Sequence, residues 1–219
     1  MKVLVYPSPQ TARQVLEHDL ELLRTGEEAV SVGSFSEMAV TLGASQHGDF
    51  PGLPQALARK VPVLSRHSGG GSLLHRPGDV HFARVIPRTS PNFPPRFTQA
   101  YASLGAGVVS WLGFRGLEAR WDPAPGSFPG YCLTSARGKV LAVGGRILGG
   151  ASQHLSHEAL LHHGAITLSL DLPLLETLFD LPRELAERQL TSLEKEGLHP
   201  LLPTDLADLA QELSREQTP

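Results

Sequence analysis

Cysteine is nearly absent from this chain, since Cys132 is the only one among 219 residues. A single cysteine excludes an intrachain disulfide, and the lack of a C-x-x-C pair excludes a structural zinc site built on cysteines. Long apolar spans are lacking as well. The opening MKVLVYPSP has only a short apolar stretch before Pro7, and no later span approaches the length that crosses a membrane. We therefore expect a cytoplasmic protein with a reduced thiol and no membrane partner.

Clustered basic charge is also missing, which excludes another class of function. The net charge is −3 and no long run of lysine or arginine occurs, so we expect no nucleic-acid partner. Hydrophobic residues make up 41% of the chain and charged residues 19%, which is typical of a globular protein. The length suits one domain, and no repeat or second core is evident. We therefore expect a single domain over residues 1–219.

The mixture of helix-like and strand-like segments predicts an α+β fold, with a central mixed β-sheet flanked by helices. Thr11 is expected to cap a helix that ends near Thr25, and Trp111 is expected to fill the core, where its indole N–H needs a partner. Further helical segments are predicted at 53–60, 96–113 and about 172–219. Short strands are predicted at 2–6, 30–32, 39–42, 61–66, 72–75, 80–86, 139–143, 146–150 and 165–170.

Two glycine-rich segments frame Cys132. The first reads RHSGGGSLLHRPGDV, and the second reads GGRILGGASQ. Glycine lets backbone N–H groups approach a ligand closely, and successive N–H groups form nests for anions and carbonyls. No G-K-[ST] follows the first segment and Pro77 interrupts any helix after it, so neither a P-loop nor a dinucleotide-binding fingerprint fits. A tight turn in a sheet is the alternative to a binding site. The flanking side chains favour a site built from Arg66, Ser68, Gly69, Gly70, Gly71 and His75.

Covalent acyl transfer is a further possibility for this region, with Cys132 and Arg146 as its catalytic candidates. A thiol beside glycine loops and a cation suits a thioester mechanism, whereas the alternative for Cys132 is a small buried hydrophobe. A Gly-Gly turn predicts a hairpin over 139–150 in which Val143 pairs with Arg146 and Leu141 with Leu148. The alternative for Arg146 is a solvated charge on that hairpin.

Histidines cluster near residue 160. On a helix, His154, His157 and Glu158 would share a face and could bind a metal. Gly164 and the following Thr-Leu-Ser run favour a strand instead, which scatters those side chains. We therefore expect no metal site.

Several segments together resemble one known family. RHSGGGSLLHRPGDVHF, AVGGRILGGASQ, LLHHGAI and VTLGASQ, which ends at Gln46, are similar to segments of the lipoate-protein ligase and octanoyltransferase family, in the same order. The resemblance runs from the first helix to about Asp171. It implies a biotin/lipoate protein ligase catalytic domain, an architecture related to class II synthetase cores. It also implies that the loop of Gly69–Gly71 lines an acyl pocket, with Arg66 and His75 beside it.

The family attaches lipoyl or octanoyl groups to a lysine of a lipoyl domain or of the glycine cleavage H protein. Its ligases activate free lipoate with ATP and Mg, and many have an extra C-terminal domain. Its transferases take the acyl group from an acyl carrier or a lipoylated protein through a cysteine thioester and require no cofactor. Cys132 matches the cysteine position of one transferase branch, and the chain has no room for the extra domain, so the resemblance favours a transferase.

The resemblance has one notable departure, because both branches have a lysine where this chain has Arg146. Ser65 and Asp79 also replace an arginine and an asparagine of many ligases. In the transferase hypothesis, the Cys132 thiolate attacks an octanoyl or lipoyl thioester, and Arg146 stabilises the thiolate and the developing oxyanion. Backbone N–H groups of the first glycine loop, or of Gly149 and Gly150, complete the oxyanion site. The alternatives are an ATP-dependent lipoate ligase and a catalytically degenerate lipoyl-binding homologue.

Overall fold

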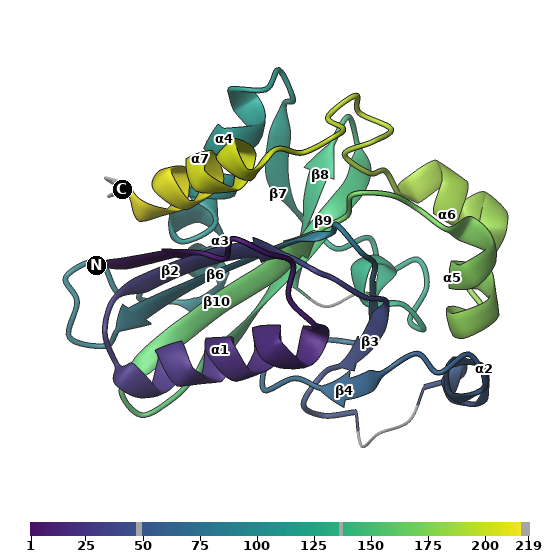
Figure 1. The fold of residues 1–219 in the computed structure, drawn as a ribbon, viewed down its shortest axis with the longest axis horizontal. Helices are drawn as coiled ribbons and strands as arrows, with labels where there is room; N and C mark the ends of the chain where they lie inside the picture. The colour runs from purple at the N-terminus through teal and green to yellow at the C-terminus, as the bar shows by residue number, and fades with distance from the viewer. Residues whose placement is uncertain (47–49, 136–137, 216–219) are drawn as a thin grey trace.

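A seven-stranded mixed sheet forms the centre of the molecule (Figure 1). This computed structural model describes residues 1–46, 50–135 and 138–215. The first two strands in sheet order pair in parallel, and the remaining neighbours pair antiparallel. The α+β class with a central mixed sheet is therefore confirmed. The sheet order is β1 (Lys2–Val5), β2 (Ala29–Ser34), β6 (Val80–Pro87), β10 (Ala159–Ile166), β9 (Arg146–Leu155), β8 (Lys139–Val143) and β7 (Ala119–Pro123).

A second, three-stranded sheet positions much of the candidate site. Its central strand β3 (Ala39–Leu42) pairs in parallel with β4 (Val63–Ser65) and antiparallel with β5 (Leu73–His75). The loop that contains Gly69–Gly71, called the first glycine loop here, connects β4 to β5, so both of its ends are held in one small sheet. This arrangement fixes the loop more firmly than a free surface turn would be fixed.

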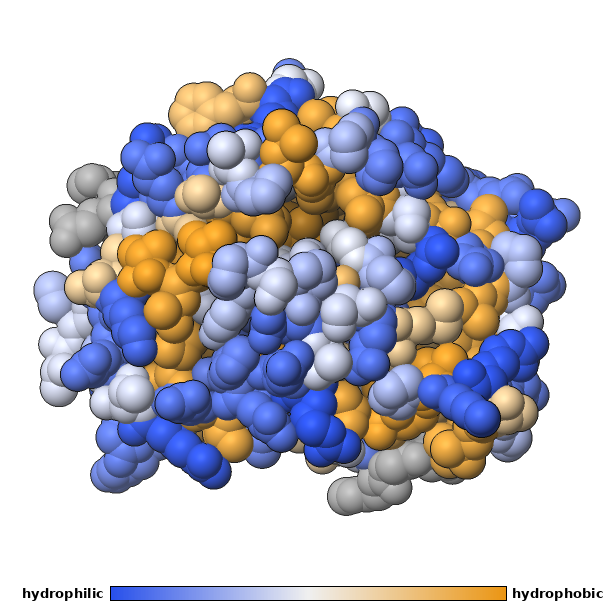
Figure 2. Space-filling model, viewed as in Figure 1, coloured by the Kyte–Doolittle hydropathy of each residue, from blue (hydrophilic) through white to orange (hydrophobic). Residues whose placement is uncertain are grey.

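Helix α1 (Ala12–Thr25) covers one face of the large sheet. Its start was predicted correctly: the Thr11 side chain accepts from the Gln14 backbone N–H, and the Gln14 side chain accepts from Thr11 in return, which forms a capping box. The helix ends at Gly26, whose φ of 64° suits glycine. Its outward face is hydrophilic, as Figure 2 shows in blue, and its inward face packs on β6 and β10.

The C-terminal helix α7 (Pro203–Ser214) and α4 (Ala106–Gly113) pack together on the opposite face of the sheet. Trp111 is fully buried there and donates its indole N–H to the Asp205 carbonyl over 2.9 Å, so the expected core position and partner are confirmed. The helix predicted over 96–113 is in fact two helices, because Trp121 packs against Gly105 at the break. The other helices are α2 (Leu53–Ala58), α3 (Phe97–Ser103), α5 (Leu172–Phe179) and α6 (Arg183–Gln189), with a 3₁₀ turn η1 (Cys132–Thr134).

The β8–β9 hairpin differs from its predicted register in one respect. Val143 pairs with Arg146 as expected, but Leu141 pairs with Gly149 instead of Leu148. A register shift beside Leu141 leaves one extra residue in β9, which is a β-bulge. The bulge reverses the inward and outward alternation along β9 beyond the turn. In the part of the chain that the structure describes, no helix is both long and apolar enough to cross a membrane.

Candidate active site

A cavity of about 340 Å³ lies between α1, the two sheets and the 3₁₀ turn. This volume is at the lower end of the range of ligand pockets, about 300–1,000 Å³. Apolar side chains such as Val15, Leu73 and Val140 form much of its wall. A polar side faces them, formed by the first glycine loop and by β9 and β10. Such a cavity suits a ligand with an apolar chain and one reactive polar end.

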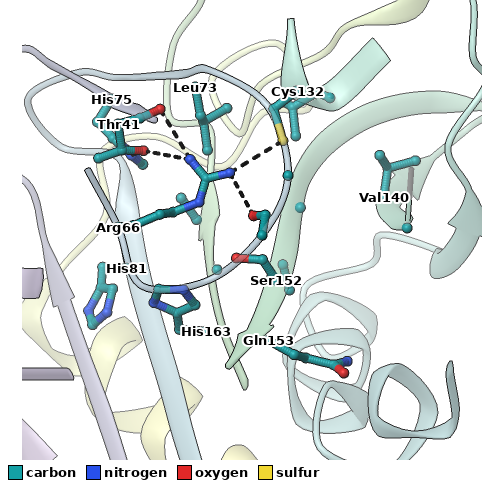
Figure 3. A pocket seen from close by; sticks show the side chains of 18 of the residues that line it. Thr41, Arg66, Leu73, His75, His81, Cys132, Val140, Ser152, Gln153 and His163 are labelled. Atoms are coloured by element: carbon teal, nitrogen blue, oxygen red, sulfur yellow. Dashed lines mark hydrogen bonds between the residues drawn. The ribbon is translucent and has the colours of Figure 1, made fainter. Parts of the chain in front are cut away.

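Cys132 lies at the polar wall of this cavity, and two donors converge on its sulfur, of which Figure 3 shows Arg66. The Gly71 backbone N–H donates to Sγ over 3.3 Å, and Arg66 Nη2 lies 3.8 Å from Sγ. The backbone of Cys132 is fixed in turn, since its N–H donates to the Ser72 carbonyl over 2.9 Å. Because a thiolate accepts stronger hydrogen bonds than a thiol, both donors are placed to stabilise negative charge on this sulfur during a reaction.

Arg66 is buried, with 6% of its surface exposed, and the loop carbonyls hold its guanidinium in place. Nη2 donates to the Gly69 carbonyl over 2.9 Å and to the Gly71 carbonyl over 2.8 Å, while Nη1 donates to the Thr41 carbonyl over 3.1 Å. Burial lowers the pKa of Arg66, although the nearby Cys132 opposes that shift. Among the described residues, no carboxylate pairs with Arg66. A Cys132 thiolate would supply the missing negative charge.

Gly70 allows the loop to approach the sulfur. Its φ is 103°, in a region that residues with a Cβ rarely adopt. A Cβ at this position would lie 2.7 Å from Arg66 Nη2 and 3.1 Å from Cys132 Sγ. The glycine thus serves both the backbone conformation and the close contact.

His75 contacts Thr41, the residue that Arg66 also contacts. Its Nε2 is 2.9 Å from Thr41 Oγ1, and its ring stacks on Phe35 with a centroid distance of 4.3 Å. Burial lowers the pKa of His75 to about 3, and the charges of Arg66, His81 and His163 add to that shift. A neutral imidazole here suits the positioning of Thr41 and Arg66 better than proton transfer at the reacting sulfur.

The structure does not bring Arg146 to Cys132. Arg146 lies beside the hairpin turn, outside the cavity wall, and its Nη2 donates to Glu196 over 2.8 Å. The segment that follows α6 packs at this end of β9, since Thr191 N–H donates to the Ile147 carbonyl over 2.8 Å, and it supplies the glutamate. The place next to the sulfur that was expected for Arg146 is therefore taken by Arg66.

The two adjacent glycines of β9 differ in their relation to the cavity. Gly150 borders the cavity, whereas Gly149 does not. A Cβ on Gly149 would lie 2.3 Å from the Ala165 carbonyl, so this glycine permits close strand pairing. Lys139, which was not predicted as a site residue, lines the cavity.

Ser68, which the sequence assigned to the site, belongs to a row of polar side chains whose other members, Ser152, His163 and Asp19, were not predicted. Ser68 Oγ lies 2.6 Å from His163 Nε2 and 2.7 Å from Ser152 Oγ, and His163 Nδ1 lies 2.6 Å from the Asp19 carboxylate. One signal was present in the sequence, because Asp19 occupies the apolar stripe of an amphipathic helix, where an unpaired carboxylate would be unfavourable.

The histidines near residue 160 lie on strands and in the turn between them. His154 is on β9, while His157 and Glu158 lie in the turn before β10. Within the ranges that the structure describes, no group of three histidine, cysteine, aspartate or glutamate side chains is arranged to hold a metal ion.

Comparisons with known proteins agree with this architecture. A family model described as the lipoyl protein ligase A/B catalytic domain matches residues 26–216. Octanoyltransferase LipM of Exiguobacterium sp. is 29% identical over 183 residues, which are 77% of this chain and 60% of that protein. Octanoyltransferase LipM of Geobacillus kaustophilus is 28% identical over 136 residues, 58% of this chain and 49% of that protein. The chain thus spans about half to three fifths of the length of these relatives.

Solved structures share the fold. A lipoate-protein ligase A bound with ATP superposes with a TM-score of 0.75 at 19% identity, covering 98% of this chain and 85% of that one. A bipartite lipoate protein ligase from Thermoplasma acidophilum, described with its E2 lipoyl domain, gives a TM-score of 0.75 at 18% identity, covering 97% of this chain and 82% of that one. The expected ligase-type architecture is confirmed. The chain belongs to the lipoyl protein ligase A/B catalytic-domain family.

Proposed function

We propose that this protein transfers an octanoyl or lipoyl group, through a thioester on Cys132, to a lysine of a lipoyl domain or of the glycine cleavage H protein. The observation that carries the proposal is the convergence of Arg66 and the Gly71 N–H on the Cys132 sulfur, at the wall of a largely apolar cavity. A lipoate ligase route does not need an activated thiol, so this convergence favours the transferase over the ligase.

The proposed reaction begins with attack of the Cys132 thiolate on the carbonyl carbon of a thioester donor, an acyl carrier or a lipoylated protein. A new carbon–sulfur bond forms, and the donor sulfur leaves with the electron pair of the old one. The apolar wall holds the acyl chain, while Arg66 and the Gly71 N–H stabilise the sulfur before attack and again when it leaves.

The second step passes the acyl group to the lysine amine of the acceptor. Conversion of a thioester to an amide is downhill, so the proposed route requires neither ATP nor Mg. The LipM relatives, named as octanoyltransferases, support the reaction class. The ligase described with its E2 lipoyl domain supports the class of acceptor. We place the reaction in the cytoplasm, because a catalytic cysteine must remain reduced.

The test offers the protein two substrates separately. In one tube it receives octanoyl-loaded carrier protein without ATP, and in the other free lipoate with Mg·ATP, each with a lipoyl domain. We expect acylation of the domain in the first tube, and an intact mass that shows one octanoyl group on the enzyme. Cys132→Ala should lose both signals.

Other outcomes would identify the alternatives. Lipoylation in the second tube alone, unaffected by Cys132→Ala, would overturn the proposal in favour of a ligase. Binding of octanoate with no transfer from either substrate would overturn it in favour of a degenerate lipoyl-binding protein.

A further inference from the structure

A row of four hydrogen-bonding side chains runs from the cavity into the protein interior. It begins at Ser152 on β9, passes through Ser68 in the glycine loop and His163 on β10, and ends at Asp19 in α1. The three links measure 2.7, 2.6 and 2.6 Å. Ser152 and His163 line the same cavity as Cys132, as Figure 3 shows. The cysteine mechanism proposed above leaves this row without a role.

The protonation state of Asp19 fixes the direction of the row. Burial opposes its ionisation, but the charges and hydrogen bonds of His81 and His163 outweigh burial and hold the pKa of Asp19 below its ordinary value. The carboxylate accepts from His163 Nδ1–H, and in the neutral imidazole Nε2 then accepts from the Ser68 hydroxyl. Ser68 in turn accepts from the Ser152 hydroxyl. Every donor thus points toward Asp19, and the Ser152 oxygen can accept a proton from a group in the cavity.

The same loop carries this row and the sulfur donors. Ser68 lies between Arg66 and Gly71, which both donate to the Cys132 sulfur. A six-residue segment thus contacts the sulfur at its two ends and the histidine at its middle. An acyl group on Cys132 has its carbonyl carbon one bond beyond the sulfur, in the cavity that Ser152 lines.

We propose that Ser152, Ser68, His163 and Asp19 form a proton relay for the second half of the reaction, the attack of the acceptor amine; this inference rests on the proposed function. The amine nitrogen forms a bond to the thioester carbonyl carbon, the carbon–sulfur bond breaks, and its electron pair leaves on Cys132. The attacking nitrogen must also lose a proton. That proton passes to the Ser152 oxygen while Ser152 passes its own to Ser68 and Ser68 its own to His163 Nε2. The imidazolium that forms is stabilised by the Asp19 carboxylate, as in serine hydrolases.

The relay predicts different effects on two kinds of acceptor. An attacking amine must lose a proton to the relay, whereas a thiolate has no proton to lose. The enzyme is first loaded with octanoate from octanoyl-CoA and freed of excess donor. It is then challenged either with Nα-acetyl-lysine amide or with N-acetylcysteamine thiolate, and loss of the octanoyl group is followed by intact mass. We expect Ser152→Ala and His163→Gln to slow the amine reaction by about a hundredfold or more, the usual contribution of general base catalysis, and to leave the thiolate reaction at the wild-type rate.

Three further variants complete the test. Ser68→Thr retains a hydroxyl in the row and should keep more amine reactivity than Ser68→Ala. Ser31→Ala is the matched control for a buried serine, because Ser31 Oγ on β2 has no hydrogen-bond partner among the described residues. It should leave both reactions unchanged.

The possible failures are distinguishable. A wild-type chain whose Cys132 never takes up octanoate overturns the proposed function and the relay with it. If Cys132 loads normally but Ser152→Ala and His163→Gln lose the amine and thiolate reactions equally, the relay alone is overturned. The relay is also overturned if these variants lose neither reaction.

Discussion

At the scale of single residues, Arg66 and Arg146 form a matched pair for testing what activates Cys132. Arg66 donates to the sulfur, whereas Arg146 donates to Glu196 outside the cavity. We expect Arg66→Met to slow alkylation of Cys132 by iodoacetamide at neutral pH about tenfold or more, because hydrogen bonds to charged groups are worth about 1.5–3 kcal/mol. Arg146→Met should be alkylated at the wild-type rate.

Timed alkylation followed by intact mass measures both rates. Circular dichroism must accompany it, because Arg66 also holds the carbonyls of Gly69 and Gly71. Loss of the partly exposed Arg146–Glu196 pair should lower the free energy of unfolding by only about 0.2–1 kcal/mol. Equal alkylation rates in the two variants would contradict the assignment of Arg66, and a slow rate in Arg146→Met alone would return the role to Arg146.

The sequence could predict part of this site. The glycine loop and its neighbours were recognisable because glycine runs and flanking polar residues are local signals. The contact between His163 and Asp19 was not recognisable, because they are 144 positions apart in the sequence and only the packing of α1 on β10 brings them together. The position of Arg146 could not be predicted either, because its partner Glu196 belongs to a segment with no local link to the hairpin.

At the scale of elements, the contact between α4 and α7 depends on Gly107. A Cβ there would lie 2.6 Å from the Leu213 Cα and N atoms and 2.7 Å from the Glu212 carbonyl carbon. All three are backbone atoms, which cannot move without displacing α7. We expect Gly107→Ala to lower the free energy of unfolding by about 1–3 kcal/mol, the usual penalty of overpacking. Urea denaturation measures this loss.

Gly113 in the same helix provides the control. A Cβ at Gly113 would have no neighbour within 4 Å. Gly113→Ala should leave stability unchanged or raise it slightly, because alanine is the better helix former by about 0.8–1 kcal/mol. If both substitutions had the same effect, helix propensity and not the α4–α7 contact would set the response.

Elements with strong local signals were predicted best. The Thr11 cap and the helical spacing of apolar residues located α1 to within a residue. The last central strand was predicted at 165–170 but lies at Ala159–Ile166, because Leu160 and Leu161 are both buried and the usual alternation is absent. Strand β7 was missed because it is a short edge strand with polar residues, defined by its pairing with β8 and not by its own pattern.

At the scale of the whole molecule, buried ionisable groups should make stability depend on pH. Burial lowers the pKa of His162 to about 3, and His163 and Arg84 add to that shift. The pKa of His75 is about 3 for similar reasons. Burial raises the pKa of Asp79 to about 7, although hydrogen bonds from the Leu168 and Arg76 backbones oppose the shift.

These shifts have opposite signs. Between pH 3 and the ordinary histidine value of 6.5, each of the two histidines binds a proton on unfolding, so stability falls as pH falls. Asp79 releases a proton on unfolding between its ordinary value of 3.8 and 7, so its contribution rises as pH falls. The contribution of Asp19, whose pKa is lowered, is lost only in stronger acid. Two protons bound and one released leave a net uptake of one proton between about pH 4 and 6.5.

We therefore expect the free energy of unfolding to fall by about 1.4 kcal/mol for each pH unit below 6.5, the slope of one proton. Urea denaturation at closely spaced pH values from 4.5 to 8 would measure it. His162→Gln removes one of the two histidine protons, so its slope in the same window should approach zero. His157→Gln, at an exposed histidine in the β9–β10 turn, should keep the wild-type slope. If His162→Gln also kept the wild-type slope, the acid sensitivity would arise outside the buried His162 ring. The packing of His162 between Tyr101 and Trp121 would then have to tolerate the charged imidazolium.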